Sequence, residues 1–264
     1  MNLKMEGKRA LVTGSTAGIG YAIALALARE GAEVIVNGRT QKRVDETLAR
    51  MRKEHSTAKL QGFAADLGSA EGCAKVAQQF SEIEILVNNL GIFEPREFDN
   101  ITDTEWQRMF EVNVMSGVRL SRAYLSGMKR RNWGRIVFIS SESGVQIPAE
   151  MIHYGMTKTA QIAVARGLAE TCAGTNVTVN SVLVGPTASE GVGEFVASLA
   201  REKGVTPQEF EKEFFQTMRG TSLVKRFLQP DEVAAVVTFL CSPAASAING
   251  APVRAEGGII KAAL

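Results

Sequence analysis

A tyrosine and a lysine stand four positions apart, at Tyr154 and Lys158, in a stretch with the apolar periodicity of a helix. Residues at this spacing share one helix face, so the phenol and the ammonium group would be neighbours. A phenol is a poor base at neutral pH, and lowering its pKa by about three units takes roughly 4 kcal/mol of differential stabilisation of the phenolate. A nearby cation supplies such stabilisation, so the pair indicates a proton donor or acceptor. An isolated pair of this kind is usually a surface pair, so the surrounding motifs decide its meaning.

A loop rich in glycine follows the first apolar run of the chain and precedes a helical pattern. Glycines let the backbone approach a pyrophosphate, and the helix behind them offers free N–H groups and the positive end of its dipole. The spacing is G-x3-G-x-G rather than G-x-G-x-x-G, and glycine turns with a purely structural role are the alternative. The loop positions expected to bind a dinucleotide are Gly14, Ser15, Thr16, Gly18, Ile19 and Gly20.

The end of the second apolar run indicates which dinucleotide binds. Sites that prefer NAD usually place an acid there, which holds the ribose 2′-hydroxyl. This chain has Gly38 at that place, followed by Arg39. A guanidinium suits a 2′-phosphate, so the residues predict NADP (as NADPH in the reduced form), with NAD as the alternative. The competing interpretation of Arg39 is a solvated charge at a strand end.

Short apolar runs alternate with helical patterns along the chain. The runs predict strands at 9–13, 33–36, 59–65, 85–87, 135–140, 177–183 and 252–255. The patterns predict helices at 19–30, 41–54, 69–80, 102–129, 154–171, 207–218 and 231–240. Such alternation favours a mostly parallel sheet with helices on both faces. We expect an α/β fold, a single doubly wound Rossmann-type domain over residues 1–264 with a seven-stranded sheet; a (β/α)8 barrel is the main alternative.

Composition argues against several classes of protein. The 264 residues include 30 basic and 28 acidic side chains, so no charge excess favours a nucleic-acid partner. Cys73, Cys172 and Cys241 are odd in number and far apart, and neither His55 nor His153 has a ligand-like spacing to them. We therefore expect neither a disulfide framework nor a metal site. We find no signal peptide and no apolar run of membrane-spanning length, which predicts a cytoplasmic protein without a membrane partner.

Together these motifs resemble those of the short-chain dehydrogenase/reductase family over essentially the whole chain. The glycine loop matches T-G-x-x-x-G-I-G, positions 88–91 resemble N-N-A-G with Leu90 for alanine, and positions 256–258 resemble D-G-G. Four residues fall in the order and spacing of the family's catalytic tetrad, namely Asn113, Ser141, Tyr154 and Lys158.

The resemblance implies an enzyme that moves a hydride between a nicotinamide and a carbonyl or alcohol carbon, with Tyr154 as general acid or base. Ser141 would polarise the substrate oxygen, and Lys158 would hold the nicotinamide ribose. Asn113 would hold a water in a proton relay through Lys158, or would kink its helix. Other expected cofactor contacts are Asp66, Leu67, Asn89, Gly91, Gly185, Thr187 and Ser189, in addition to Tyr154 and Lys158.

Three of these contacts carry an alternative. Asp66 would meet the adenine or cap a turn. Ser189 falls where the family has a threonine that binds the nicotinamide amide, and Thr187 is the alternative donor.

The segment from about 189 to 226 has no strand pattern and corresponds to the family's mobile substrate lid. Phe210 and Phe214, four apart, would face the substrate or pack in the core. Next to Ser141, Glu142 could face the substrate, but its loop position favours a solvated carboxylate. A basic cluster near the end of the 102–129 helix is expected to be solvated and comprises Lys129, Arg130, Arg131 and Arg135.

The sequence therefore predicts an NADP-dependent oxidoreductase with a small-molecule carbonyl or alcohol substrate. One alternative is a 3-oxoacyl-acyl-carrier-protein reductase, which a basic docking patch beside the pocket would favour. The other is a non-catalytic NADP-binding sensor, against which an intact tetrad argues. The resemblance also implies a homotetramer, with a dimer as the alternative, because the helices at 102–129 and 154–171 form interfaces in the family. Ala160, Ala163 and Gly167 would allow close packing there.

Overall fold

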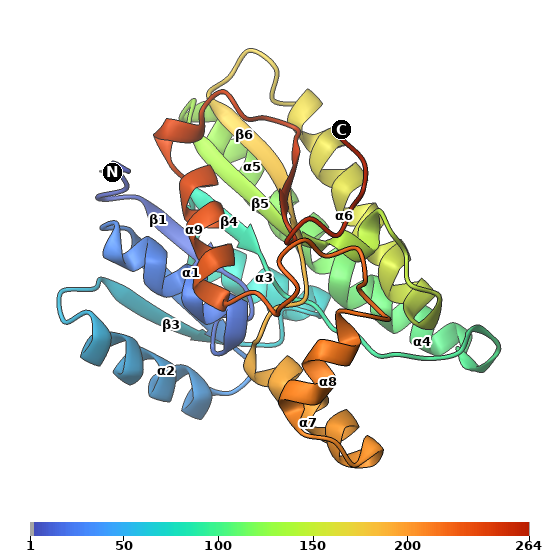
Figure 1. Cartoon of the computed structure of the whole chain (residues 1–264). Coiled ribbons are helices and arrows are strands. Elements are labelled where there is room, and N and C mark those ends of the chain that lie inside the picture. The colour runs from blue at the N-terminus through green and yellow to red at the C-terminus, as the bar shows by residue number, and fades with distance from the viewer. Residues whose placement is uncertain (1–2, 264) are drawn as a thin grey trace.

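A parallel β-sheet forms the centre of the computed structural model, which describes residues 3–263 apart from the side chains at positions 191, 194, 195, 199 and 202 (Figure 1). The sheet has the strand order β3-β2-β1-β4-β5-β6-β7, and all neighbours are parallel. The strands are β1 (Arg9–Val12), β2 (Glu33–Gly38), β3 (Leu60–Ala64), β4 (Ile85–Asn88), β5 (Gly134–Ser141), β6 (Val177–Val184) and β7 (Pro252–Ala255).

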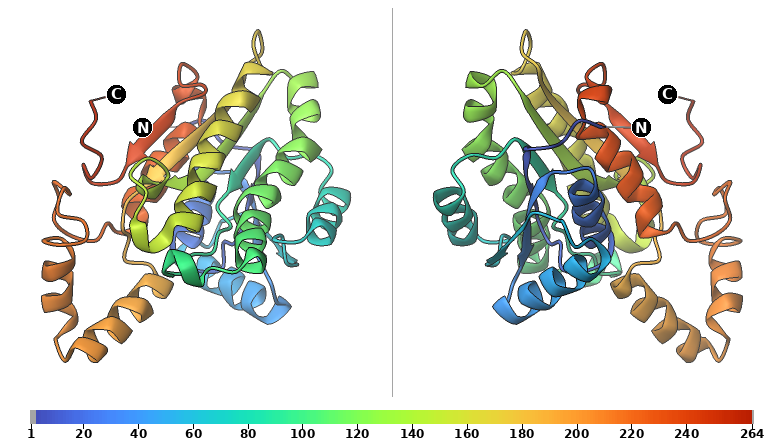
Figure 2. Two further views of the ribbon diagram at one scale, coloured as in Figure 1. Left: turned by 90° about the vertical axis from the view of Figure 1, so that its right-hand side faces the viewer. Right: turned by 90° about the vertical axis from the view of Figure 1, so that its left-hand side faces the viewer.

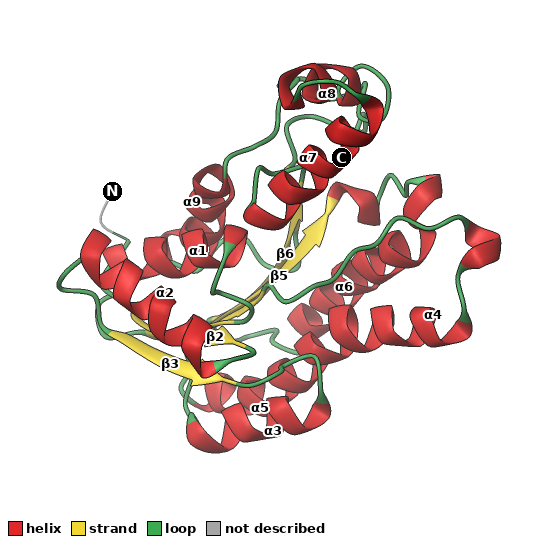
Figure 3. Cartoon of the chain, turned by 90° about the horizontal axis from the view of Figure 1, so that it is seen from below, coloured by secondary structure: helices red, strands yellow, loops and turns green. Residues whose placement is uncertain are grey.

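Helices cover both faces of the sheet (Figure 3). One layer contains α1 (Gly18–Arg29), α2 (Gln41–Glu54) and α9 (Pro230–Leu240). The other contains α3 (Ala70–Gln79), α5 (Ser116–Arg130) and α6 (Ile152–Glu170). Because each face of the sheet has its own apolar core, β4, β5 and β6 are buried along their whole length, as continuous apolar runs predict. The doubly wound fold is confirmed, and the open edges at β3 and β7 exclude the barrel.

The predicted helix at 102–129 is interrupted by a turn of π-helix. It begins with α4 (Asp103–Phe110), which Thr102 and Glu105 cap reciprocally as their spacing predicts. The π-helical segment at Glu111–Met115 follows and leads directly into α5. Insertions of this kind often occur at functional sites, and this one contains Asn113.

Two helices between β6 and α9 stand out from the body of the molecule (Figure 2). They are α7 (Glu190–Lys203) and α8 (Pro207–Phe214). The sequence predicted one helix at 207–218; α8 ends earlier, and α7 was missed because two glycines in its first turns weaken the helical pattern. Short 3-10 turns lie at Phe98–Asn100, Glu142–Gly144, Ala149–Met151 and Pro243–Ala245.

One predicted surface charge belongs to the interior. Arg135 is 2% exposed, and its guanidinium donates to the backbone oxygens of Gly134, Asn176 and Ser242. The prediction of a solvated charge was wrong here because the start of the buried strand β5 is covered by the segments that contain Asn176 and Ser242. Among the described residues, no helix is long and apolar enough to cross a membrane, and no group of three metal-ligating side chains gathers.

Candidate active site

A cavity of about 580 Å³ opens at the carboxyl ends of the central strands. This edge is where ligands bind in open parallel sheets. Ile19 in the first turn of α1, the ends of β5 and β6, and residues of α6, α7 and α8 line it. Predicted site residues that line it are Ile19, Asn89, Gly91, Ser141, Tyr154, Lys158, Gly185, Thr187 and Ser189.

The glycine loop has the close packing expected of a phosphate-binding turn. Gly14 and Gly18 adopt φ angles of +60° and +55°, which favour glycine. A Cβ added at Gly20 would lie 2.4 Å from the backbone oxygen of Gly14, so only glycine lets α1 start so close to β1. The loop and the N-terminus of α1 therefore form a cradle that fits a dinucleotide pyrophosphate.

Side chains from neighbouring strands hold this cradle in place. Asn89 Nδ2 donates to the backbone oxygens of Thr13 (2.8 Å) and Gly14 (3.2 Å). Ser15 is fully buried, its hydroxyl donates to Val12 O at 2.7 Å, and its N–H donates to Asn37 O at 2.9 Å. Both donors of Ser15 are used inside the fold, so this predicted cofactor contact shapes the loop rather than offering a donor to a ligand.

The end of β2 is packed against the glycine loop. A Cβ at Gly38 would lie 2.5 Å from Thr16 Cγ2 and 3.2 Å from Val44 Cγ2. A side chain at this position, which would carry an acid in an NAD-specific site, would therefore have to displace the Thr16 side chain. Arg39, the next residue, is exposed at the same edge of the sheet.

The two residues predicted to contact the cofactor after β3, Asp66 and Leu67, have different surroundings. Asp66 Oδ1 accepts a hydrogen bond from Gly68 N at 2.9 Å, which is the turn cap that was the alternative to an adenine contact. Leu67 is 1% exposed and packs in the core beneath α3 and α5. A contact between Leu67 and a cofactor would therefore use its backbone, and that contact remains a prediction.

The predicted tetrad residues Tyr154 and Lys158 meet at the cavity. Lys158 Nζ lies 5.4 Å from the centre of the Tyr154 ring and donates to Ile139 O at 2.9 Å. Burial lowers the pKa of Lys158 to about 8. Burial, and then the carboxylate of Glu142, raise the pKa of Tyr154, although hydrogen bonding with Ser141 acts the other way. The chain alone thus does not supply the lowered phenol pKa that the sequence predicted, because desolvation outweighs the attraction of nearby cations.

Asn113 is 1% exposed and lies behind this pair. Its side chain accepts from Ile92 N at 2.7 Å and donates to Ile92 O and Thr157 Oγ1. Gln161, which no sequence motif indicated, connects the π-helical segment that contains Asn113 with Lys158 on α6. Its amide donates to Asn113 O at 2.6 Å and accepts from Lys158 Nζ at 3.3 Å. The only sequence signal for it was its position, three residues after Lys158 on the same helix face.

The other unexpected residue is Glu142. It is 3% exposed, so the prediction of a solvated carboxylate was wrong. Ser141 Oγ donates to Glu142 Oε2, and Arg219 Nε donates to Glu142 Oε1 at 2.9 Å. Arg219 belongs to the segment after α8, and no local pattern could pair it with a residue 77 positions earlier.

The loop after β6 lies against the end of β7. A Cβ at Gly185 would lie 2.7 Å from Glu256 O. Thr187 Oγ1 donates to Gly185 O at 2.9 Å, and Ser189 Oγ caps α7 by accepting from Val192 N at 3.4 Å. Both hydroxyls have a partner within the chain, and their contacts with a nicotinamide remain predictions.

Comparison with known proteins identifies the family. The sequence profile described as short chain dehydrogenase matches residues 8–199. The chain belongs to the short-chain dehydrogenase/reductase family. This short-chain dehydrogenase is also 51% identical over 261 residues to the uncharacterized oxidoreductase YvaG of Bacillus subtilis, and the alignment covers 99% of each chain.

Further relatives cover nearly the whole length as well. The 3-oxoacyl-acyl-carrier-protein reductase FabG of Aquifex aeolicus is 33% identical, over 98% of this chain and 100% of its own. The solved L-sorbose reductase of Gluconobacter frateurii, in complex with NADPH and L-sorbose, superposes with a TM-score of 0.92 at 29% identity, over 99% of this chain and 100% of its own. The chain is thus an NAD(P)-binding oxidoreductase that acts on a CH–OH/C=O pair.

Proposed function

We propose that this enzyme uses NADP(H) to interconvert a carbonyl and an alcohol on a small molecule, with Tyr154 as the general acid or base. The observation that carries the proposal is one continuous cavity. Tyr154, Ser141 and Lys158 line it together with Ile19 and Asn89 of the cofactor cradle. A substrate oxygen in this cavity can thus reach a proton donor beside the place where a nicotinamide is expected.

The side chains divide the work of a reduction. Tyr154 donates its proton to the carbonyl oxygen, and Ser141 donates a hydrogen bond to the same oxygen. Lys158 stabilises the resulting phenolate, since its ammonium is held near the ring by Ile139 O and Gln161. The hydride is the chemistry that a bound nicotinamide supplies. The oxidation of an alcohol uses the same groups in reverse.

The preference for NADP over NAD rests on the end of β2. Gly38 carries no acid that would bind a 2′-hydroxyl, a Cβ there would meet Thr16 Cγ2 at 2.5 Å, and Arg39 is exposed. A guanidinium at this place favours a phosphate. The solved L-sorbose reductase, which is similar over its whole length, was crystallised with NADPH.

The segment at 189–226 fits the role of a substrate lid. The predicted single domain spans residues 1–264, of which residues 1, 2 and 264 lie outside the described part. Phe210, Phe214 and Met218 line the cavity from this segment. Phe214 also stacks on Phe227, with ring centres 5.3 Å apart. The apolar side chains of the lid would exclude water from the reacting atoms when the lid is closed over the cavity.

The basic cluster bears on the acyl-carrier alternative. Lys129 and Arg130 end α5, and Arg131 donates to Ile83 O before the start of β4. The cluster therefore lies at the amino ends of the strands, whereas the cavity lies at their carboxyl ends. The cluster therefore offers no docking patch beside the cavity, which supports a free small molecule as substrate. A non-catalytic sensor would not need Tyr154, Ser141 and Lys158 to line one cavity, so we disfavour that alternative.

We also propose a homotetramer, with a dimer as the alternative, and a cytoplasmic location. Ala163 and Gly167 are exposed on α6, and a Cβ at Gly167 would touch nothing, so a second helix can approach closely. The molar mass from calibrated light scattering tests the assembly, and the mass of a monomer would refute both the tetramer and the dimer.

The function is tested by following NADPH consumption with a panel of ketones. Tyr154→Phe should abolish turnover and leave NADPH binding nearly intact. Tyr124→Phe is the matched control, because the buried Tyr124 hydroxyl has no hydrogen-bond partner among the described residues and lies in the core away from the cavity. Turnover that persists in Tyr154→Phe would refute the assignment.

A further inference from the structure

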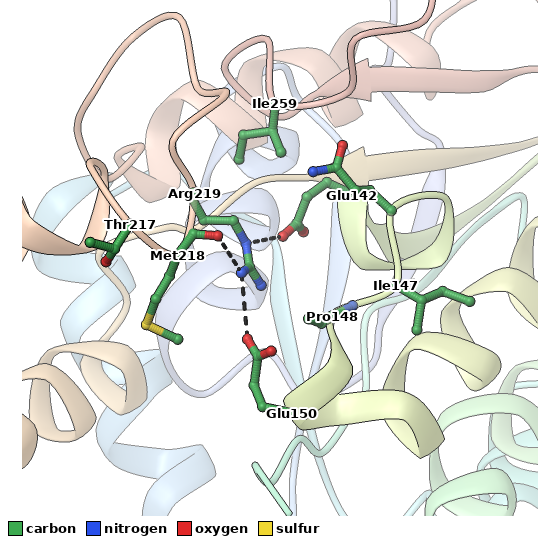
Figure 4. A pocket seen from close by; sticks show the side chains of 9 residues that line it. Glu142, Ile147, Pro148, Glu150, Thr217, Met218, Arg219 and Ile259 are labelled. Atoms are coloured by element: carbon green, nitrogen blue, oxygen red, sulfur yellow. Dashed lines mark hydrogen bonds and ion pairs between the residues drawn. The ribbon is translucent and has the colours of Figure 1, made fainter. Parts of the chain in front are cut away.

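Glu142 and Arg219 form a buried ion pair at the wall of the catalytic cavity. Figure 4 shows Arg219 reaching from the lid segment to Glu142 on one side and Glu150 on the other. The side chains of Arg219 and Glu142 are 10% and 5% exposed, and they line both this cavity and a second, smaller one. An ion pair costs desolvation energy, so its place beside Ser141 calls for a role.

The local charge argues for a neutral substrate. Glu150 lies 3.6 Å from Arg219, so two carboxylates face one guanidinium. An anionic substrate would compete with both carboxylates for Arg219. A cationic substrate would approach both Arg219 and Lys158, which line the same cavity. A neutral group that forms hydrogen bonds avoids both penalties.

The hydroxyl proton of Ser141 has two competing acceptors. Ser141 has one O–H, and without a substrate it donates to Glu142 Oε2. To polarise a substrate carbonyl, this O–H must turn away from Glu142, which leaves a buried carboxylate oxygen short of a donor. A substrate that brings its own donor next to the carbonyl restores that hydrogen bond at the moment when Ser141 leaves it.

We propose that the substrates of this enzyme are neutral hydroxy ketones, in which a hydroxyl on the carbon next to the carbonyl donates to Glu142. The proposal rests on the function proposed above and adds Glu142 as the residue that determines specificity. Arg219 holds the Glu142 carboxylate toward the cavity from the lid side. The rest of the substrate meets apolar side chains, since Phe93, Phe210 and Met218 line the same cavity.

Three substrates of matched length test the proposal with the full-length enzyme and NADPH. They are 1-hydroxyhexan-2-one, 2-hexanone without the hydroxyl, and 2-oxohexanoate with a carboxylate in its place. We expect kcat/KM to fall from the first to the second by on the order of ten- to a hundredfold, the usual weight of a hydrogen bond to a buried charge. The keto acid should be the poorest of the three.

Glu142→Gln separates this effect from the intrinsic reactivity of the ketones. With its amide oxygen on Arg219, the glutamine presents an N–H group toward Ser141 and cannot accept the substrate hydroxyl. The hydroxyl preference should therefore shrink to about threefold or less. The kcat/KM for the keto acid should be higher than that of the wild type. Glu150→Gln is the matched control, because Glu150 lines the cavity without touching Ser141, and it should keep the hydroxyl preference.

The outcomes are distinct. An equal hydroxyl preference in the wild type and in Glu142→Gln, with NADPH affinity and melting temperature unchanged, would overturn the role of Glu142. A wild-type preference for the keto acid would overturn the neutral substrate class. If no ketone shows turnover that depends on Tyr154, the proposed function fails, and this inference fails with it.

Discussion

Replacement of Lys158 by methionine should stabilise the protein below pH 8 while it destroys activity. Burial lowers the pKa of Lys158 from its ordinary value of 10.5 to about 8, so the folded state holds this proton less tightly than the unfolded chain. At 1.36 kcal/mol for each pKa unit, keeping the ammonium charged at pH 7 costs the folded state about 3 kcal/mol. Methionine has a similar length and removes that cost.

The gain is partly offset by two lost hydrogen bonds. Lys158 donates to Ile139 O at 2.9 Å and to Gln161 Oε1 at 3.3 Å, and each bond contributes about 1 kcal/mol. The expected net stabilisation near pH 7 is about 1 kcal/mol, which corresponds to roughly 2–4 °C in Tm for a chain of this size.

The pH dependence is the sharper test. Between pH 8 and 10.5 the unfolded chain binds the lysine proton and the folded protein does not, so wild-type stability rises with pH in this window. The advantage of Lys158→Met should therefore shrink by about 2–3 kcal/mol between pH 7 and pH 10 and change sign. Denaturant titration of the ligand-free protein at several pH values measures it. Lys53→Met, at an exposed lysine of α2, is the control. A stability difference that is independent of pH would refute the reasoning.

Three further predictions concern the cofactor site and the relay. Gly20→Ala should cost about 1–3 kcal/mol and most NADPH affinity, because its Cβ would strike Gly14 O, whereas Gly193→Ala, with open space around it, should cost nothing in a thermal melt. Arg39→Asp should lower the NADPH/NADH ratio of kcat/KM by on the order of a hundredfold, and an unchanged ratio would remove Arg39 from the phosphate site. Gln161→Leu removes an acceptor from the Lys158 ammonium, so the alkaline limb of the kcat/KM profile should move to lower pH; an unmoved limb would contradict the link between the two side chains.

The sequence predicted the scaffold well because its signals are local. The apolar runs at 135–140 and 177–183 are β5 and β6 to within a residue or so at each end, and the Thr102 and Glu105 capping box stands where its spacing placed it. Gly14 and Gly18 adopt positive φ angles, a backbone geometry that only glycine adopts easily. The glycine spacing alone therefore predicted the cradle, without any contact information.

Long-range pairing decided the rest. Arg135 and Glu142 both look like solvated charges in the sequence, and both are buried by partners distant along the chain, Ser242 and Arg219 respectively. The π-helical turn at Asn113 does not disturb the apolar pattern of its helix enough to be recognised.

By itself, therefore, the sequence determined the order of the strands and of the helices other than α7, the glycine cradle, and the helical pairing of Tyr154 with Lys158. Each of these depends on neighbours within a few residues. The tertiary structure alone decided what surrounds that pair. It placed Gln161 between Lys158 and Asn113, and it closed Arg219 onto Glu142 beside Ser141. Desolvation and charge pairing depend on which distant segments exclude water from a group, and no local pattern records that.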